Sequence, residues 1–240
     1  LLATLFHYYV ILNYKDCIMR IESIQVGKPK TIAPNWTTSI YKTPVDGDIF
    51  LSKYNLAGDK QADLTVHGGL DKAINVYPIE HYAYWNQRAR FLLRKRIILP
   101  SPNNGAFGEN FTVSGLLEND VCIGDIFQVG TCIVEVSQPR QPCWKLARKF
   151  NQAKLPFWVQ QTGKTGWYFR VLQEGNVRKM DTFKLAQRNN PSWNLARANR
   201  LMHTRGQQRE DIVSILECQQ LSSSWKTTFE KRLSKHAQQK

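Results

Sequence analysis

Short apolar runs alternate with turn residues over most of the chain. The runs are rich in β-branched and aromatic residues, and glycine, proline, asparagine or aspartate bounds them. Both features are typical of β-strands. The predicted strands are residues 21–26, 49–51, 73–77, 111–113, 121–129 and 131–136. The clearest pair is 126–129 and 132–136, which flank Gly130 and Thr131 and therefore predict a β-hairpin.

Helical spacing interrupts the strand pattern at two places. Residues 80–91 follow a proline and contain clustered aromatic side chains. Residues 145–151 follow Cys143, and this helical pattern can be extended to residue 161. Many short strands with few helices favour a barrel or sandwich with helical insertions. We therefore expect a mainly β domain over residues 19–187.

The pattern becomes helical from about residue 188. Asn190 followed by Pro191 fits a helix N-cap and a first helical position. Apolar residues then recur at helical spacing in three groups: Leu195, Ala198, Leu201 and Met202; Ile212, Ile215 and Leu216; and Trp225, Phe229 and Leu233. Three short helices bury little surface alone, so we expect residues 188–240 to form a small three-helix domain packed on the larger one. Its outline also resembles a helix-turn-helix, which keeps DNA binding among the alternatives.

The first 18 residues do not fit this pattern. They contain the mostly apolar stretch LLATLFHYYVIL, with no basic residue before it and no clear cleavage site after it. Both would be needed in a signal peptide. Met19 is the first methionine and leads into the first predicted strand. We expect residues 1–18 to be a dispensable, non-native or disordered extension, the alternative being a surface or membrane-associating helix. A chain shortened to begin at Met19 that failed to fold would contradict this expectation.

Composition excludes several protein classes. In this chain of 240 residues, 42% are apolar and 22% are charged, which excludes disordered and collagen-like proteins. No apolar run approaches the roughly 20 residues that a membrane-spanning helix needs. The five cysteines are an odd number without a C-x-x-C pair, which argues against zinc and iron–sulfur cages and favours a reducing compartment. We therefore expect a cytoplasmic protein with no membrane partner.

The positive charge is concentrated in the second part of the chain. In total, 33 Lys and Arg stand against 19 Asp and Glu, a net charge of +14. Residues 1–139 contain 13 of each sign, whereas residues 140–240 contain 20 basic and 6 acidic residues. Such asymmetry suggests an anionic partner: a phosphorylated small molecule, a nucleic acid or an acidic protein. For any single cation, a solvated basic face is the simpler interpretation.

The segment His67-Gly68-Gly69, followed after Leu70 by Asp71 and Lys72, is the first candidate site element. Adjacent glycines let the backbone approach a ligand closely, and their N–H groups can face an anion. Lys72 adds a positive charge, and His67 can donate, accept or ligate. Taken by itself, however, this segment favours the simpler interpretation of a plain turn with a structural histidine.

Two further segments carry weaker signals. Glu109 and Asn110 place an acid and an amide beside a glycine, just before a predicted strand. Thr162, Gly163 and Lys164 resemble an anion-binding loop but lack the spacing of a nucleotide P-loop. Their cation and backbone amides could still hold one phosphate.

The segment after the predicted hairpin carries the strongest signal. Its sequence is SQPRQPCWK, in which Gln138 and Arg140 precede Cys143 and Lys145 follows it. The two prolines restrict the backbone around the cysteine. Nearby cations and a helix start favour the thiolate form, which suits nucleophilic attack or a soft metal. A buried structural cysteine near a turn is the alternative.

Four blocks of sequence resemble one known family. In chain order they are VHGGLDKAINVYPIEHY, GAFGENFTVSGLLENDVCIGDIFQVG, VEVSQPRQPCWKL and TGKTGWYFRVLQEGNV. Together they are similar to the MOSC domain, named for the C-terminal domain of molybdenum cofactor sulfurases, in its stand-alone bacterial YiiM-like branch. The tail segment LSSSWKTTFEKRL resembles that branch's small three-helix domain.

This resemblance implies a MOSC-type β-barrel that binds the molybdenum cofactor, a phosphorylated pterin dithiolene. It implies that Cys143 ligates molybdenum, which suits a soft thiolate. It also gives the cations Lys72, Arg140, Lys145 and Lys164 a role toward the phosphate and pterin. The full set of cofactor-binding candidates is His67, Gly68, Gly69, Asp71, Lys72, Glu109, Asn110, Gln138, Arg140, Lys145, Thr162, Gly163 and Lys164.

The resemblance further implies reduction of N-hydroxylated compounds, such as N-hydroxylated purine bases. Because no flavin, haem or iron–sulfur motif is visible in the sequence, electrons would come from a separate reductase, which the basic surface could dock. The family also carries an association with pyridoxal phosphate. Glu109, Asp71 and Asp125 are candidates for handling protons.

Two alternatives remain at this point. The chain could handle the molybdenum cofactor or carry sulfur as a Cys143 persulfide, without turning over a substrate. It could also be a nucleic-acid-binding module, which is less favoured because the third predicted helix uses its large apolar residues for packing. The stretch 87–96 is more basic than the family pattern, with 5 Lys or Arg in 10 residues. The oligomeric state is open, a homodimer being one option.

Overall fold

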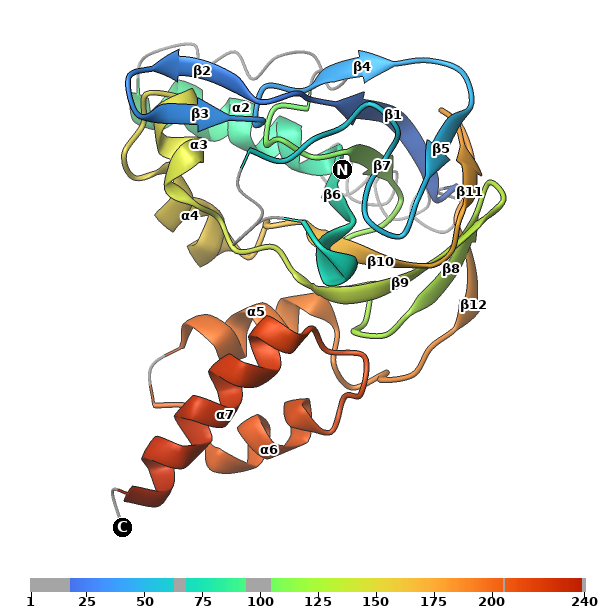
Figure 1. Cartoon of the computed structure of the whole chain (residues 1–240). Helices are drawn as coiled ribbons and strands as arrows, with labels where there is room; N and C mark the ends of the chain where they lie inside the picture. Colours follow the sequence, from blue (N-terminus) through green and yellow to red (C-terminus); the bar gives the residue numbers. More distant parts are fainter. Residues whose placement is uncertain (1–17, 63–67, 94–104, 205, 239–240) are drawn as a thin grey trace, which may run out of the picture.

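An eight-stranded curved sheet, a half-barrel, organises the molecule (Figure 1). The structure is a computed structural model that describes residues 18–62, 68–93, 105–204 and 206–238. The strands of the sheet lie in the order β12 (Lys184–Gln187), β8 (Ile126–Val129), β9 (Cys132–Pro139), β10 (Trp167–Gln173), β6 (Ile74–Pro78), β7 (Phe111–Ser114), β1 (Arg20–Val26) and β4 (Thr43–Val45). Only β6 and β7 pair in parallel within it.

Smaller elements surround the sheet. One hairpin pairs β2 (Lys30–Ala33) with β3 (Trp36–Thr38), and β5 (Ile49–Leu51) pairs with β11 (Gly175–Val177). A short 3-10 helix, η1 (Leu70–Lys72), precedes β6. The sequence pattern did not indicate β2, β3, β4, β10, β11 or β12.

The predicted hairpin is confirmed as β8 and β9, with Val129 opposite Cys132. Its turn requires glycine, because Gly130 has φ +56° and a Cβ there would lie 2.3 Å from the Asn176 carbonyl oxygen. The predicted strand over 121–129 is wrong in its first part. Asp125 accepts a hydrogen bond from the Cys122 amide at 2.9 Å, so these residues form a turn and the strand begins at Ile126.

Helices α2 (Glu80–Leu93), α3 (Trp144–Lys149) and α4 (Leu155–Thr162) lie on one side of the sheet, near β2 and β3 (Figure 1). The extension of one helix from 145 to 161 is wrong. Asn151 adopts a left-handed conformation with φ +47°, which breaks the helical path and separates α3 from α4. Together these helices enclose a second apolar cluster around Tyr77 and Phe107.

The three C-terminal helices are α5 (Leu195–His203), α6 (Arg209–Leu216) and α7 (Ser223–Gln238). The expected N-cap at Asn190 is wrong: Asn194 caps α5 by accepting a hydrogen bond from the Arg197 amide at 2.8 Å. Asn190 instead donates to the Ile123 carbonyl. The helices pack on β9 and β10 as expected (Figure 1).

One continuous apolar core joins the sheet to these helices. It contains Phe127 and Phe169 from the sheet together with Trp193, Trp225 and Phe229 from the C-terminal region. The mainly β fold with helical insertions and a C-terminal helical domain is therefore confirmed. The domain limits 19–187 and 188–240 stay predictions, and residues 1–17 lie outside the described residues. Within the described part of the chain, no helix has the length and apolar character to cross a bilayer.

Candidate functional site

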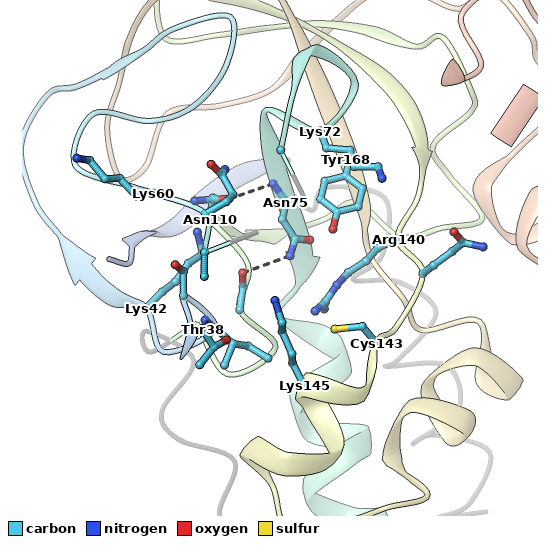
Figure 2. Close-up of a pocket in the computed structure, with 17 residues that line it drawn as sticks. Thr38, Lys42, Lys60, Lys72, Asn75, Asn110, Arg140, Cys143, Lys145 and Tyr168 are labelled. Carbon is cyan, nitrogen blue, oxygen red and sulfur yellow. Dashed lines mark hydrogen bonds between the residues drawn. The ribbon is translucent and has the colours of Figure 1, made fainter. Parts of the chain in front are cut away.

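A solvent-open cavity, with an empty volume of about 650 Å³ that includes the solvent at its mouth, brings together candidate segments from across the sequence (Figure 2). Its walls come from the segment after β3, the loop at residues 60–62, the turn around η1, strands β6 and β10, the loop before β7 and the segment between β9 and α3. Five cations line it: Lys42, Lys60, Lys72, Arg140 and Lys145. None of the described lining residues is acidic, so the cavity favours an anionic ligand.

Cys143 lies on this wall at the start of α3. Its backbone is extended, with φ −112° and ψ 167°, and its carbonyl accepts the first bond of the helix from the Leu146 amide at 3.1 Å. Proline on the preceding position restricts this entry. The side chain is half-buried and points into the cavity, on the same side as Arg140 and Lys145 (Figure 2). The thiol is therefore accessible to a ligand and surrounded by positive charge.

Arg140 is the most deeply buried of the lining cations, with 5% of its surface exposed. Its backbone is fixed by a hydrogen bond from its amide to the Gly166 carbonyl at 3.0 Å. Its Nη1 atom is buried and has no hydrogen-bond partner among the described residues. Desolvation raises the pKa of the neighbouring Tyr168 phenol, and Arg140 acts against this rise.

Other buried polar atoms of lining residues also lack partners within the described structure. They are the Asn75 Oδ1 and Ser39 Oγ atoms. Buried polar groups are normally hydrogen-bonded, and these two belong to residues that line the same cavity as Arg140. An anionic ligand with both acceptors and donors would satisfy them. The molybdenum cofactor fits this set, because it combines a phosphate for the cations with a soft metal for the Cys143 thiolate.

An ion pair that the sequence did not reveal supports the cavity. The Asp59 carboxylate, whose side chain is fully buried, accepts from Lys42 Nζ at 2.6 Å, the Gly27 amide at 2.6 Å and Asn110 Nδ2 at 2.9 Å. Burial lowers the pKa of Lys42 and the charge of Asp59 opposes this shift. Asn110 in turn accepts from the Asn75 amide. Asp59 thereby holds two lining side chains in place.

Lys149 is a second buried cation that sequence reasoning missed. Its Nζ donates to the carbonyls of Ile40 and Gly105, each at 3.1 Å. Burial lowers the pKa of Lys149 to about 8, with Glu109 opposing the shift. Ile40 lines the cavity, so this lysine fixes the cavity wall from behind. Its position in the basic helix α3 gave no local signal.

The structure brings six predicted site residues to the cavity: Gly68, Lys72, Asn110, Arg140, Cys143 and Lys145. Glu109 is adjacent but fully buried, where it accepts hydrogen bonds from Tyr82, the Phe107 amide and Thr112. Its carboxylate therefore braces the loop before β7 and does not line the cavity.

Asp71 and Gln138 face the C-terminal helices. Although burial acts to raise it, the pKa of the Asp71 carboxyl is lowered by hydrogen bonds from Arg170 and Ser223. Gln138 Oε1 accepts from Ser224 Oγ at 3.1 Å. Gly69 lies between Gly68 and η1 and is not among the lining residues.

The remaining candidates lie elsewhere. Thr162 bonds back to carbonyls of its own helix, and Gly163 ends α4 in a left-handed conformation. Lys164 Nζ lies 4.9 Å from the Tyr84 ring centroid. Asp125 is buried and paired with Arg188. His67 lies outside the described residues, and no group of three or more potential metal ligands occurs among those that are described.

Comparison with known proteins identifies the family. Residues 63–203 match the MOSC domain, and residues 193–236 match the YiiM-like, 3-alpha helix domain. The chain is 44% identical over 213 residues to the uncharacterized protein YflK of Bacillus subtilis, covering 88% of this chain and 92% of YflK. It is 34% identical over 189 residues to a protein of Gibberella moniliformis named "Reductase", covering 77% of this chain and 31% of that protein.

A solved structure agrees with these matches. The crystal structure of YiiM from Geobacillus stearothermophilus superposes with a TM-score of 0.74 at 42% sequence identity, covering 90% of this chain and 99% of that chain. Both parts of the chain, the sheet and the C-terminal helices, are thus accounted for by one architecture. The chain therefore belongs to the MOSC-domain family and carries the YiiM-like three-helix domain after its MOSC domain.

Proposed function

We propose that this protein is a molybdenum-cofactor-dependent oxidoreductase that reduces N-hydroxylated compounds, with electrons supplied by a separate reductase. The observation that carries the proposal is the half-buried Cys143 thiol in a cavity lined by five cations. Membership of the MOSC family, which is associated with the molybdenum cofactor, supports the cofactor. The similarity to a fungal protein named "Reductase" supports a redox role.

Different residues of the cavity would bind different parts of the cofactor. Cys143 would provide the thiolate ligand, and Arg140 would use its unpartnered Nη1 to bind phosphate or a pterin oxygen. Lys72 and Lys145 would add charge that holds the anion in place. The bound cofactor would supply two-electron oxidation–reduction chemistry at its metal. Asp59 would keep Lys42 charged in the buried wall.

Reduction needs an electron source, which we place in a partner protein. The surface next to Cys143 offers a docking point: Trp144 is 54% exposed, and the guanidinium of the exposed Arg148 lies 5.2 Å from the ring centroids of both Trp144 and Trp36. An acidic redox protein would complement this basic and aromatic surface. Because the surface adjoins the thiol, a donor bound there would be close to the cofactor.

The proposal is tested by metal analysis of the full chain purified from a host that makes the molybdenum cofactor. We expect about one molybdenum per chain in the wild type and almost none in Cys143→Ser, with reduction of an N-hydroxylated purine base lost in parallel. Cys122→Ser, which changes a buried thiol outside the cavity, should retain both.

Other outcomes would select other functions. A molybdenum-free wild type carrying a persulfide on Cys143 would support a cofactor-handling or sulfur-carrying protein. Molybdenum binding without reduction of any N-hydroxylated compound would refute the proposed substrate class but retain the cofactor. Tight, steeply salt-dependent binding to DNA by a metal-free chain would favour the nucleic-acid alternative.

A further inference from the structure

The first turn of the C-terminal helix α7 is bonded to the two segments that carry cavity cations. Asp71 Oδ2 accepts from both the amide and the Oγ of Ser223, at 2.9 and 3.0 Å. Ser223 is the first residue of α7, and its amide has no acceptor within the helix. Asp71 thus caps a helix of the other domain, where a negative charge is favoured.

The same junction fixes η1 from two further sides. Asp71 Oδ1 accepts from Arg170 Nε at 3.0 Å, and the Asp71 carbonyl accepts from Ser137 Oγ. Ser137 also accepts, through its carbonyl, the Ser222 amide at 3.0 Å. Asp71, Ser137, Arg170, Ser222 and Ser223 therefore form one network, which we call the interdomain junction.

The position of Lys72 depends on this junction. Lys72 follows Asp71 directly and lines the cavity. Two glycines, Gly68 and Gly69, directly precede η1 in the chain and have φ angles of +84° and +81°. Two glycines restrict the backbone little, so the contacts of Asp71, more than the preceding chain, set the place of η1.

We propose that the three-helix domain is part of the functional site, with Asp71 and Ser223 acting as positioning residues that hold Lys72 in the wall of the cavity that Cys143 also lines. The proposal rests on the proposed site, but not on which cofactor or substrate occupies it. It gives the C-terminal domain a role in shaping the charge of the cavity in addition to stability. Neither Asp71 nor Ser223 is among the residues that line the cavity.

The test measures the electrostatic potential at the Cys143 thiol. The full chain is purified from a host that cannot make the molybdenum cofactor, and alkylation by anionic iodoacetate is compared with alkylation by neutral iodoacetamide. In both reactions the thiolate displaces iodide, so the ratio of the two rates reports the local potential. The rates of Cys143→Ser are subtracted to remove the other cysteines.

The direction in which the iodoacetate-to-iodoacetamide rate ratio changes distinguishes a displaced Lys72 from the direct effect of removing the Asp71 charge. Asp71→Asn removes a negative charge, so by direct electrostatics alone it would raise the iodoacetate-to-iodoacetamide ratio. If Lys72 is displaced, the ratio falls instead, by about threefold. Ser223→Ala leaves the charge unchanged and should lower the ratio in the same direction by a smaller factor.

A matched variant controls for loss of an aspartate–arginine pair. Asp211→Asn breaks the half-exposed pair with Arg197, 2.9 Å long, within the helical domain, and should leave the ratio unchanged. An unchanged or raised ratio in Asp71→Asn, in protein that melts as a folded chain, would overturn the proposal. If Asp71→Asn does not fold, an unchanged ratio in Ser223→Ala would overturn it. Absence of molybdenum from the wild type would refute the proposed function and leave this result standing.

Discussion

Lys42 Nζ lies 2.6 Å from both carboxylate oxygens of Asp59, and only 8% of the lysine side chain and none of the aspartate side chain is exposed. A pair enclosed this fully is costly to form but more costly to break, because removing one partner leaves the other charge buried alone. Since Lys42 lines the cavity and Asp59 also holds Asn110, this pair links stability to the shape of the site.

Asp59→Asn should therefore destabilise the protein strongly. We expect the free energy of unfolding to fall by about 3–5 kcal/mol, the cost of leaving a buried charge without its partner. Denaturant unfolding measures the change. Asp211→Asn, which breaks a half-exposed pair, should cost no more than about 1 kcal/mol. If the two variants lose the same free energy of unfolding, the buried pair contributes no more to stability than the half-exposed one.

Lys149 should make stability depend on pH in the alkaline range. Burial lowers its pKa in the folded chain to about 8, from an ordinary value of 10.5. Between these two values the unfolded chain binds the proton more tightly, so stability rises with pH. The rise attributable to this group should not exceed about 3 kcal/mol, and its contribution should become constant once the pH is about one unit or more below the folded-state pKa.

The comparison of wild type with Lys149→Met isolates this effect. The difference in unfolding free energy between the two proteins should change in favour of the wild type from pH 8 to 10.5. Lys154→Met, at an exposed position after α3, should show no such dependence. A difference that stays flat over this range would contradict a lowered pKa for Lys149.

The parts of the site that could be predicted are those encoded by neighbours in sequence. The β8–β9 hairpin follows from a glycine turn between two apolar runs, and Cys143 follows from prolines and cations within a few residues of it. Asp59 was missed because its partners Lys42 and Asn110 are distant in the chain and meet only when strands β4 and β7 both pair with β1. Gly163 was misleading for the converse reason: a glycine that ends a helix looks, in sequence alone, like one in an anion-binding loop.

Turnover driven by the protein electron donor should depend on Arg148. Its exposed guanidinium is held by Trp36 and Trp144 next to Cys143, so Arg148→Glu should repel an acidic donor. We expect turnover with the protein donor to fall by about threefold or more at low salt and the difference to shrink as salt screens the charges. Turnover driven by a small chemical reductant, and the molybdenum content, should not change.

Arg209→Glu makes the same charge change at an exposed position in α6 and is the matched control. If it slows turnover with the protein donor as much as Arg148→Glu does, the effect comes from net charge alone. In that case the donor does not dock beside Cys143.

Arg140 should show a conflict between stability and function. Its guanidinium is buried and its Nη1 has no partner among the described residues, so in the absence of a ligand it carries an unbalanced desolvation cost. Arg140→Met, which keeps an unbranched side chain, should stabilise the cofactor-free protein by about 1–3 kcal/mol. The same change removes the donor that we assign to the anionic cofactor. The molybdenum content of protein from a cofactor-competent host should therefore fall by about tenfold or more, which corresponds to the loss of one charge-assisted hydrogen bond to the cofactor.

Thermal melting of the cofactor-free chain and metal analysis of the loaded chain measure the two effects of Arg140→Met separately. Lys184→Met, on the exposed strand β12, is the control and should alter neither. A variant that melts at a lower temperature than the wild type while retaining its molybdenum would mean that Arg140 serves the fold, and that the cofactor is held by the lysines of the cavity instead.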